Sequence, residues 1–178
     1  MTRHILSAYQ ADIQERLEGL EPANANGYQV DVEEIEPGWV VEDDNVWVEA
    51  FSGRHGSWPV LGYRFTTPGG VIVISGDTAP YAGMVENYQG CDILVHEVYS
   101  WAGLQKRPAA WQRYHTAVHT STKELAELAV AVQPKLLVLY HQLLWGQTEE
   151  DLIREIKQIF RGEVVSGHDL DVFELGID

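Results

Sequence analysis

The chain has 178 residues, of which 45% are hydrophobic and 22% charged, which is enough for one globular domain with a hydrophobic core. No apolar run approaches the roughly 20 residues that cross a bilayer, and a single cysteine, Cys91, excludes an internal disulfide. Acidic residues outnumber basic ones by 27 to 12, and the net charge of −15 repels phosphate backbones and anionic lipid. We therefore expect no membrane partner and no nucleic-acid partner. The N-terminus has no signal-peptide core, so we also expect a cytoplasmic location.

The first part of the chain predicts a helix followed by strands. Apolar side chains recur at helical spacing over residues 3–20. Alternating apolar and polar residues over 28–32 and 46–50 predict two strands. Residues 53–59 are rich in Gly and Pro and predict a loop, and residues 62–74 predict a hairpin around Pro68-Gly69-Gly70.

The next part predicts a buried strand, an undecided segment and a helix. Ile93–Val95 is a short apolar run typical of a buried strand. Residues 99–118 have no clear period and indicate either a lid or a loose helix. Ser121 and Glu124 have the spacing of a capping box, which predicts a helix that ends before Pro134.

The last part continues the alternation of strand and helix. Leu136–Tyr140 predicts a fully apolar strand, and Thr148 is expected to cap a helix with an apolar stripe. Residues 164–165 and 170–173 predict final strands. Strands early in the chain and helix–strand alternation later indicate an α/β (α+β) fold with a mixed sheet, formed by residues 1–178 as a single domain.

Three apolar runs each end on residues that can bind a metal or move a proton. Residues 71–74 lead to Asp77, residues 93–95 lead to His96-Glu97, and residues 136–140 lead to His141. Strands of one sheet deliver such side chains to one edge, where α/β folds place their sites. Each residue also has a structural reading, in which Asp77 caps a turn or helix and His141 is satisfied by a backbone carbonyl.

Further histidines and one glutamate are candidates for catalysis. Neighbours on a strand point to opposite faces, so only one of His96 and Glu97 is expected to face the site. Glu97 could orient a catalytic histidine, whereas His96 is a possible additional ligand or a packing residue. His119 directly precedes the predicted helix, and we interpret it as a general acid. His55, in the Gly-rich loop, either contacts substrate or closes a turn.

Taken together, these stretches resemble the second half of the metallo-β-lactamase superfamily, in the branch of ribonuclease Z and arylsulfatase-like hydrolases. The resemblance runs from about residue 5 to the end of the chain. It rests on segments whose order and spacing match, namely 54–55, 62–65, Ile74-Ser75-Gly76-Asp77-Thr78, Leu94-Val95-His96-Glu97, His119-Thr120-Ser121, Leu139-Tyr140-His141 and the tail from 164–165 to 169–171.

The resemblance implies a site and half of a fold. Asp77 would bridge two metal ions, His141 would be a terminal ligand of one, and His119 would donate a proton with Glu97 behind it. The ions would be zinc, with manganese or iron as alternatives. The fold would be one half of an αββα sandwich, with helices on one face of a mixed sheet. The family's His-x-His-x-Asp-His motif, which supplies most of the ligands, is absent from this sequence.

The resulting functional hypothesis is a metal-dependent hydrolase of a phosphoester, sulfate ester or related small substrate, incomplete in this chain. Its expected substrate is a small anionic ester, and its expected partner is a second copy of the chain or a missing N-terminal half. Two alternatives remain open. One is a catalytically inactive scaffold or dimerisation module without metal. The other is a single-ion site that Asp77, His141 and a neighbour such as His96 form across a dimer.

Overall fold

The computed structural model describes residues 1–19 and 24–174, and the chain divides into two compact units, Met1–Ile35 and Glu36–Asp178. The first unit contains helices α1 (Thr2–Ala8) and α2 (Gln10–Glu18). The helix expected over residues 3–20 is therefore divided at Tyr9, and its last residue, Leu20, lies outside the described residues. The strand expected at 28–32 is wrong, since these residues are turn and irregular backbone. Alternation alone does not make a strand when no neighbouring strand pairs with it.

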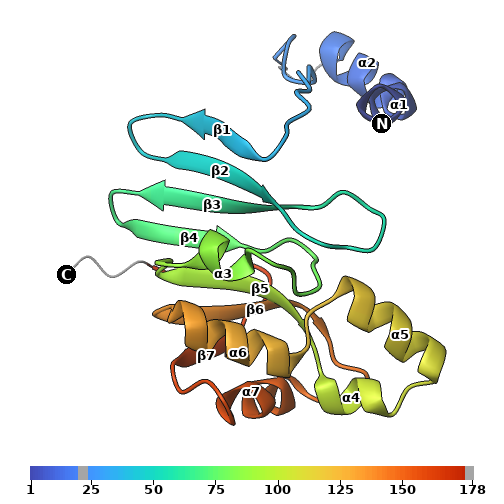
Figure 1. Cartoon of the computed structure of the whole chain (residues 1–178). Coiled ribbons are helices and arrows are strands. Elements are labelled where there is room, and N and C mark those ends of the chain that lie inside the picture. The colour runs from blue at the N-terminus through green and yellow to red at the C-terminus, as the bar shows by residue number, and fades with distance from the viewer. Residues whose placement is uncertain (20–23, 175–178) are drawn as a thin grey trace. The chain divides into compact units, whose positions relative to one another are not determined.

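The second unit is built on a seven-stranded mixed sheet whose strands follow one another in chain order (Figure 1). Its strands are β1 (Gly38–Glu42), β2 (Trp47–Ser52), β3 (Leu61–Thr67), β4 (Gly70–Ile74), β5 (Ile93–Tyr99), β6 (Leu136–Leu143) and β7 (Glu163–Ser166). Strands β1 to β4 are antiparallel, and β4 to β7 are parallel. The predicted mixed sheet is confirmed, and the parallel part delivers the carboxyl ends of β4, β5 and β6 to one edge.

Helices cover one face of the parallel strands. The helices of this unit are α3 (Met84–Tyr88), α4 (Trp101–Gln105), α5 (Ala109–Val118), α6 (Thr122–Val132) and α7 (Glu149–Lys157). Side chains of α3, α6 and α7 form one core with alternate residues of the sheet, such as Leu94, Leu137 and Leu139, each fully buried. The expected layer of helices on one sheet face is thus confirmed. The undecided segment 99–118 consists of α4 and α5, which lie beside the carboxyl edge of the strands (Figure 1).

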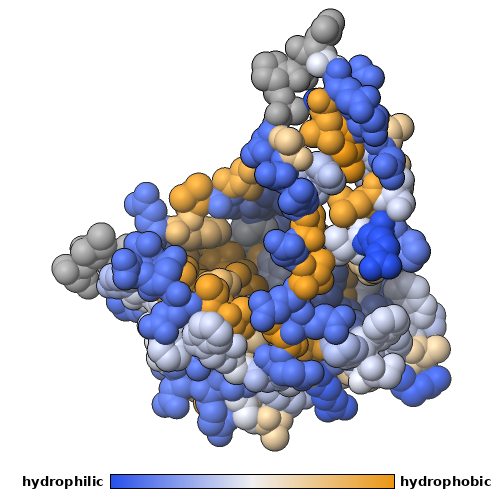
Figure 2. All heavy atoms as spheres, turned by 90° about the horizontal axis from the view of Figure 1, so that it is seen from above, coloured by the Kyte–Doolittle hydropathy of each residue, from blue (hydrophilic) through white to orange (hydrophobic). Residues whose placement is uncertain are grey.

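The residues that alternate with this core point to the opposite face, where Ile93 and Val138 are buried but other residues are less well covered. Ile72, Ile74 and Val95 are only half-buried there. Hydrophobic residues also reach the surface of the molecule (Figure 2). On β1, the edge strand of the sheet, Trp39 and Val41 are exposed.

Of two further predicted elements, one is confirmed and the other is wrong. The hairpin at residues 62–74 is confirmed as β3 and β4. The strand expected at 170–173 is wrong, because these residues are irregular and Val172 is 82% exposed. In the part of the chain that the structure describes, there is no helix of the length and hydrophobicity that crossing a bilayer requires.

Candidate metal centre

Asp77 is delivered to the sheet edge by a sharp turn after β4. Backbone pairing continues one residue beyond the strand, where the Ser75 amide donates to the Val95 carbonyl at 3.0 Å. Gly76 then takes a left-handed backbone conformation with φ +65°, and a Cβ on it would lie 2.6 Å from the Leu61 carbonyl oxygen. Glycine is therefore required at this position, and it turns the chain so that Asp77 leaves the strand direction.

His141 lies on a β-bulge in β6. Glu97 pairs with Tyr140 and Val98 pairs with Gln142, so His141 is the extra residue on its strand. Its φ of +44° is left-handed, which is uncommon for a residue with a side chain. Bulges occur next to active sites, where they re-aim a side chain. Here the bulge takes His141 out of the regular alternation of β6.

His119 lies between α5 and α6. It ends α5 in an extended conformation (φ −131°, ψ 166°), and Ser121 then begins α6 through the predicted capping box with Glu124. A bridge between Tyr99 and Ser121 fixes this connection to the end of β5. The side chain of His119 is thereby held at the edge where β4, β5 and β6 end, and the residue is only 6% exposed.

Asp77, His119 and His141 converge at this edge. One potential ligand atom from each residue lies within 4.8 Å of the other two. Asp77 Oδ2 and His141 Nε2 are 3.5 Å apart. Two ligands of a tetrahedral zinc ion with bonds of 2.0–2.1 Å are separated by about 3.3 Å, so this spacing fits a shared divalent ion. A carboxylate and two imidazoles are also a suitable set of zinc ligands.

Glu97 lies beneath this cluster and holds it together. Its side chain is fully buried, and its Oε1 accepts the backbone amides of Thr78 at 3.2 Å and Thr120 at 2.9 Å. These are the residues that directly follow Asp77 and His119. One carboxylate oxygen therefore fixes the two loops that present the candidate ligands.

The other oxygen of Glu97 faces His119. Glu97 Oε2 lies 3.4 Å from His119 Nδ1, and both atoms are buried without a hydrogen bond. Buried polar atoms without partners are uncommon and are often found at functional sites. This pair fits a histidine that holds or moves a proton, and it leaves Nε2 of His119 as the nitrogen that can act elsewhere.

His96 and His55 lie outside the three-residue cluster. His96 points to the helix-covered face, where it is fully buried, its Nδ1–H donates to the Glu97 carbonyl at 2.6 Å, and its ring lies 5.7 Å from that of Tyr88. Burial lowers the pKa of His96, which favours the neutral ring. His55 Nδ1–H donates to the Val118 carbonyl at 2.8 Å, and its ring is 5.1 Å from that of His119.

Sequence reasoning missed the small hydroxyl residues that support the site. The Ser75 hydroxyl accepts the Glu97 amide at 3.3 Å, and the Thr120 hydroxyl donates to the Thr78 carbonyl at 2.6 Å. All of these residues are fully buried. The signal was available, since each hydroxyl residue lies within two positions of a candidate residue, but a Ser or Thr in a loop is too common to single out.

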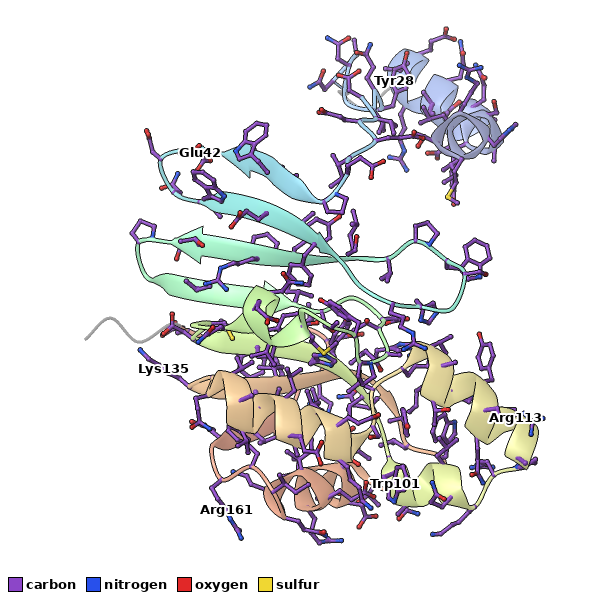
Figure 3. The ribbon with its side chains drawn as sticks, viewed as in Figure 1. Tyr28, Glu42, Trp101, Arg113, Lys135 and Arg161 are labelled. Atoms are coloured by element: carbon purple, nitrogen blue, oxygen red, sulfur yellow. The ribbon has the colours of Figure 1, made fainter. Side chains whose placement is uncertain are left out.

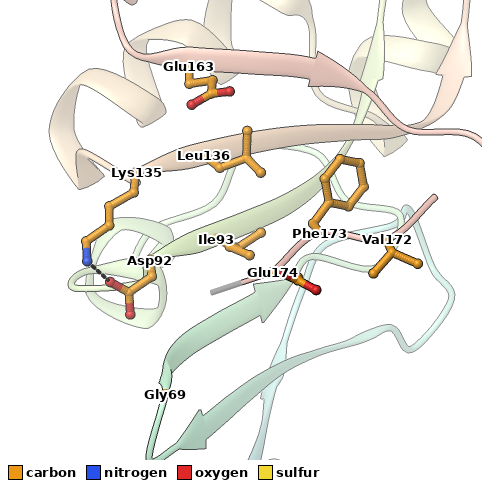
Figure 4. A pocket seen from close by; sticks show the side chains of 9 residues that line it. All are labelled: Gly69, Asp92, Ile93, Lys135, Leu136, Glu163, Val172, Phe173 and Glu174. Carbon is orange, nitrogen blue, oxygen red and sulfur yellow. Dashed lines mark ion pairs between the residues drawn. The ribbon is translucent and has the colours of Figure 1, made fainter. Parts of the chain in front are cut away.

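A pocket of about 350 Å³ lies elsewhere, at the amino ends of the parallel strands (Figure 4). Ile93 and Leu136 line it together with Phe173, and Lys135 pairs with Asp92 at its margin at 3.2 Å. None of the candidate site residues lines this pocket. The candidate site residues therefore lie at the carboxyl edge of the sheet and not in this pocket.

Comparison with known proteins identifies the family. Residues 2–142 match the sequence profile of the Beta-lactamase superfamily domain. The metallo-beta-lactamase fold protein YhfI from Bacillus subtilis superposes with a TM-score of 0.68 over 93% of this chain and 62% of that chain, at 18% identity. Together with the mixed sheet and the cluster at its edge, these matches show that the chain belongs to the metallo-beta-lactamase superfamily.

Within the superfamily, several curated relatives are ribonucleases Z. The enzyme from Sulfolobus acidocaldarius is 34% identical over 98 residues, which are 55% of this chain and 31% of that protein. The enzyme from Mycolicibacterium paratuberculosis is 31% identical over 145 residues, covering 79% of this chain and 51% of that protein. The short form of human tRNase Z shares the fold with a TM-score of 0.55 at 22% identity, over 78% of this chain and 47% of that chain. The chain spans 31% to 51% of the length of these relatives.

These findings correct the expected partners. A small anionic ester substrate, with nucleic acid excluded, is wrong because the relatives are named as enzymes that act on RNA. The expectation failed because net charge sums over the whole chain, whereas a nucleic acid responds to the local field at its binding site. Membership of the superfamily implies a divalent metal, in agreement with the cluster of Asp77, His119 and His141.

Proposed function

We propose that this chain carries the second half of the active site of a metal-dependent hydrolase that cleaves phosphodiester bonds in RNA. The observation that carries the proposal is the convergence of Asp77, His119 and His141 at the carboxyl edge of the sheet, with Glu97 beneath them. The ribonuclease Z relatives support RNA as the substrate class, and phosphorus rather than sulfur as the atom attacked.

The proposed roles follow from position and chemistry. Asp77 and His141 hold a divalent ion, which we propose to be zinc because the two ligands are a carboxylate and an imidazole. When bound, such an ion lowers the pKa of a water molecule and neutralises charge on phosphate oxygens. His119 donates a proton to the departing oxygen, and the Glu97 carboxylate, 3.4 Å from its Nδ1, orients the ring. His55 lies beside His119 and contacts the substrate.

The test is hydrolysis of a labelled RNA by zinc-loaded protein, with an aryl sulfate as the comparison substrate. Asp77→Asn is expected to lose both bound zinc and activity. His119→Ala is expected to keep its zinc and to lose about 10²- to 10⁴-fold in rate, as removal of a general acid does. His4→Ala, which removes an exposed histidine of the first unit, is the control and should match the wild type. Equal RNA hydrolysis by Asp77→Asn and wild type would refute the proposal.

A second candidate is a module that has the fold but no hydrolytic activity of its own. The sequence contains no His-x-His, and in residues 1–19 and 24–174 only one group of three potential ligands comes together. Zinc sites use three or four protein ligands, so three are enough for one ion and too few for two. Zinc-loaded wild-type protein that hydrolyses neither RNA nor aryl sulfate would favour this candidate.

A further inference from the structure

One stretch of this acidic chain has the opposite charge. None of the 27 acidic residues lies between Glu97 and Glu124, whereas four of the 12 basic residues do. These are Lys106, Arg107, Arg113 and Lys123. Lys106 and Arg107 lie in the turn between α4 and α5, Arg113 lies on α5, and Lys123 lies in the first turn of α6. Three of the four cations therefore belong to the α4–α5 segment beside the candidate metal centre (Figure 1).

The cations at the α4–α5 turn and on α5 do not form ion pairs with acidic side chains of the described residues. Lys106, Arg107 and Arg113 form no ion pair within the described residues, and Lys106 and Arg113 are exposed. Figure 3 shows Arg113 on α5, while Trp101 begins α4. The nearby carboxylate of Glu155 is already engaged, because it accepts the backbone amide of Trp101 at 2.9 Å. Unpaired, exposed cations are free to neutralise phosphates.

Exposed aromatic rings accompany these cations on α5. Trp111 is 50% exposed and Tyr114 is 61% exposed. Both contact His115, with ring centroids 5.3 Å and 5.1 Å away. Large aromatic side chains left half in water beside cations are the features with which proteins bind unpaired bases.

A continuous row of rings connects these aromatics to the site. His115 stacks on His119 at 5.7 Å, and the His119 ring lies 5.6 Å from that of His141. Trp145 supports the row from the side, 4.6 Å from His115. If the bases of a single-stranded RNA stack on Trp111 and Tyr114, its backbone would therefore extend toward the candidate ligands.

We propose that α4 and α5 form a platform for a single-stranded RNA end, a surface defined here by Lys106, Arg107, Trp111, Arg113 and Tyr114. Bases stack on the two aromatic rings, and the cations contact the adjacent phosphates. The inference rests on RNA being the substrate of the proposed function and adds which surface holds it. It also explains how a chain with a net charge of −15 binds RNA, since the field at the platform is locally positive.

The test measures binding of a short fluorescein-labelled RNA without secondary structure, by fluorescence anisotropy at low salt with a chelator present. Without metal there is no hydrolysis, so the result does not depend on the catalytic proposal. Trp111→Ala combined with Tyr114→Ala is expected to weaken binding by roughly 10-fold or more, because the stacking of one base on each ring is lost. Trp111→Phe combined with Tyr114→Phe keeps the rings and should retain most of the affinity.

Matched controls separate the platform from general effects. Trp39→Ala removes a tryptophan of β1 that is 61% exposed, and Arg161→Ala removes an exposed cation from another part of the unit. Both should bind RNA as the wild type does. Arg113→Ala should reduce the dependence of log affinity on log salt by about 0.7, which is one phosphate contact on a single strand.

Three outcomes would overturn the inference. One is equal binding by the wild type and the double alanine variant, with unchanged circular dichroism. Another is competition by polyglutamate as effective as by unlabelled RNA, which would reveal a general anion surface. The third is stronger binding of fully double-stranded RNA than of the single strand. Loss of binding in the double alanine variant together with an absence of zinc-dependent hydrolysis would support the platform while refuting the proposed function.

Discussion

At the scale of single residues, the site depends on backbone conformations that most residues avoid. Gly76 directly follows Ser75 at the end of β4 and has φ +65°, and His141 lies in β6 and has φ +44°. These two strands flank β5, which carries Glu97. Conformations of this kind cost free energy and persist where the surrounding structure enforces them. Each turns the chain just where a candidate ligand must leave the sheet.

We predict that Gly76→Ala destabilises the protein and weakens zinc binding. Its Cβ would meet the Leu61 carbonyl oxygen at 2.6 Å, and the left-handed backbone adds about 1–2 kcal/mol of strain. Gly83→Ala is the matched control, since Gly83 is also left-handed (φ +92°) but has open space around its Cβ position. Urea unfolding should show a larger loss of stability for Gly76→Ala, and zinc titration a loss of affinity for that variant alone. Equal losses in both variants would contradict this account of Gly76.

A second prediction separates the structural and chemical roles of Glu97. Glu97→Ala leaves the amides of Thr78 and Thr120 buried without an acceptor, at a cost of roughly 2–6 kcal/mol for the two. Glu97→Gln keeps an oxygen for these amides but removes the charge that faces His119. We therefore expect Glu97→Gln to be far more stable than Glu97→Ala in urea unfolding, yet slower in RNA hydrolysis than the wild type. A Glu97→Gln variant with undiminished hydrolysis would show that the charge plays no part.

At the scale of elements, the start of α6 links fold and site. Ser121 accepts the Glu124 amide at 3.2 Å, and Glu124 in turn accepts the Ser121 amide at 2.9 Å. His119 lies two residues before this cap. The capping box therefore fixes not only the helix but also the loop that presents the histidine.

We expect Ser121→Ala to cost about 1 kcal/mol of stability and also to slow RNA hydrolysis, because the loop that presents His119 is loosened. Thr148→Ala is the control, because Thr148 caps α7 through the same kind of box with Asp151, but does not adjoin a candidate site residue. The two variants should lose similar stability in thermal or urea unfolding, and only Ser121→Ala should hydrolyse RNA more slowly than the wild type. If both variants hydrolyse RNA at the wild-type rate, the cap does not position His119.

The sequence predicted those elements whose local pattern agrees with their surroundings. The helix at Ser121 and the strand at Leu136 were foreseeable because caps and apolar runs are local signals. The expected strands at 28–32 and 170–173 failed, since a strand needs a partner and alternation does not supply one. The continuation of β6 through His141 was also beyond prediction, because a bulge is set by pairing with β5 and leaves no mark on the sequence.

The sequence was enough to predict which residues form the candidate site, but not how all of them are arranged. The convergence of Asp77 and His141 follows from parallel strands ending at one edge. The side of β5 on which His96 and Glu97 would fall could not be decided, because a shift of one residue exchanges the two faces. Glu97 faces the site, and His96 faces the helices.

At the scale of the whole molecule, one buried histidine ties global stability to pH. His96 is fully buried, and burial lowers its pKa below the value of 6.5 that it has when exposed. Below about pH 6.5, His96 therefore binds a proton more readily in the unfolded chain than in the folded chain. The free energy of unfolding falls as the pH is lowered.

We predict that the free energy of unfolding of the wild type decreases from pH 7 toward pH 5, with a slope from this residue of at most about 1.4 kcal/mol per pH unit. His96→Asn cannot titrate, and its amide can still donate to the Glu97 carbonyl. Its stability should depend less steeply on pH over the same interval, as measured by urea unfolding at each pH. Parallel curves for the two proteins would mean that His96 does not contribute.

The central claim is that the carboxyl edge of the sheet holds a divalent ion through Asp77 and His141. Calorimetric titration of zinc into the metal-free protein tests it most directly. We predict near-stoichiometric binding by the wild type and by His4→Ala, and binding at least about 10-fold weaker in Asp77→Asn and in His141→Ala, since each loses one of few ligands. Zinc binding that is equal in the wild type and both ligand variants, or absent from the wild type, would contradict the account.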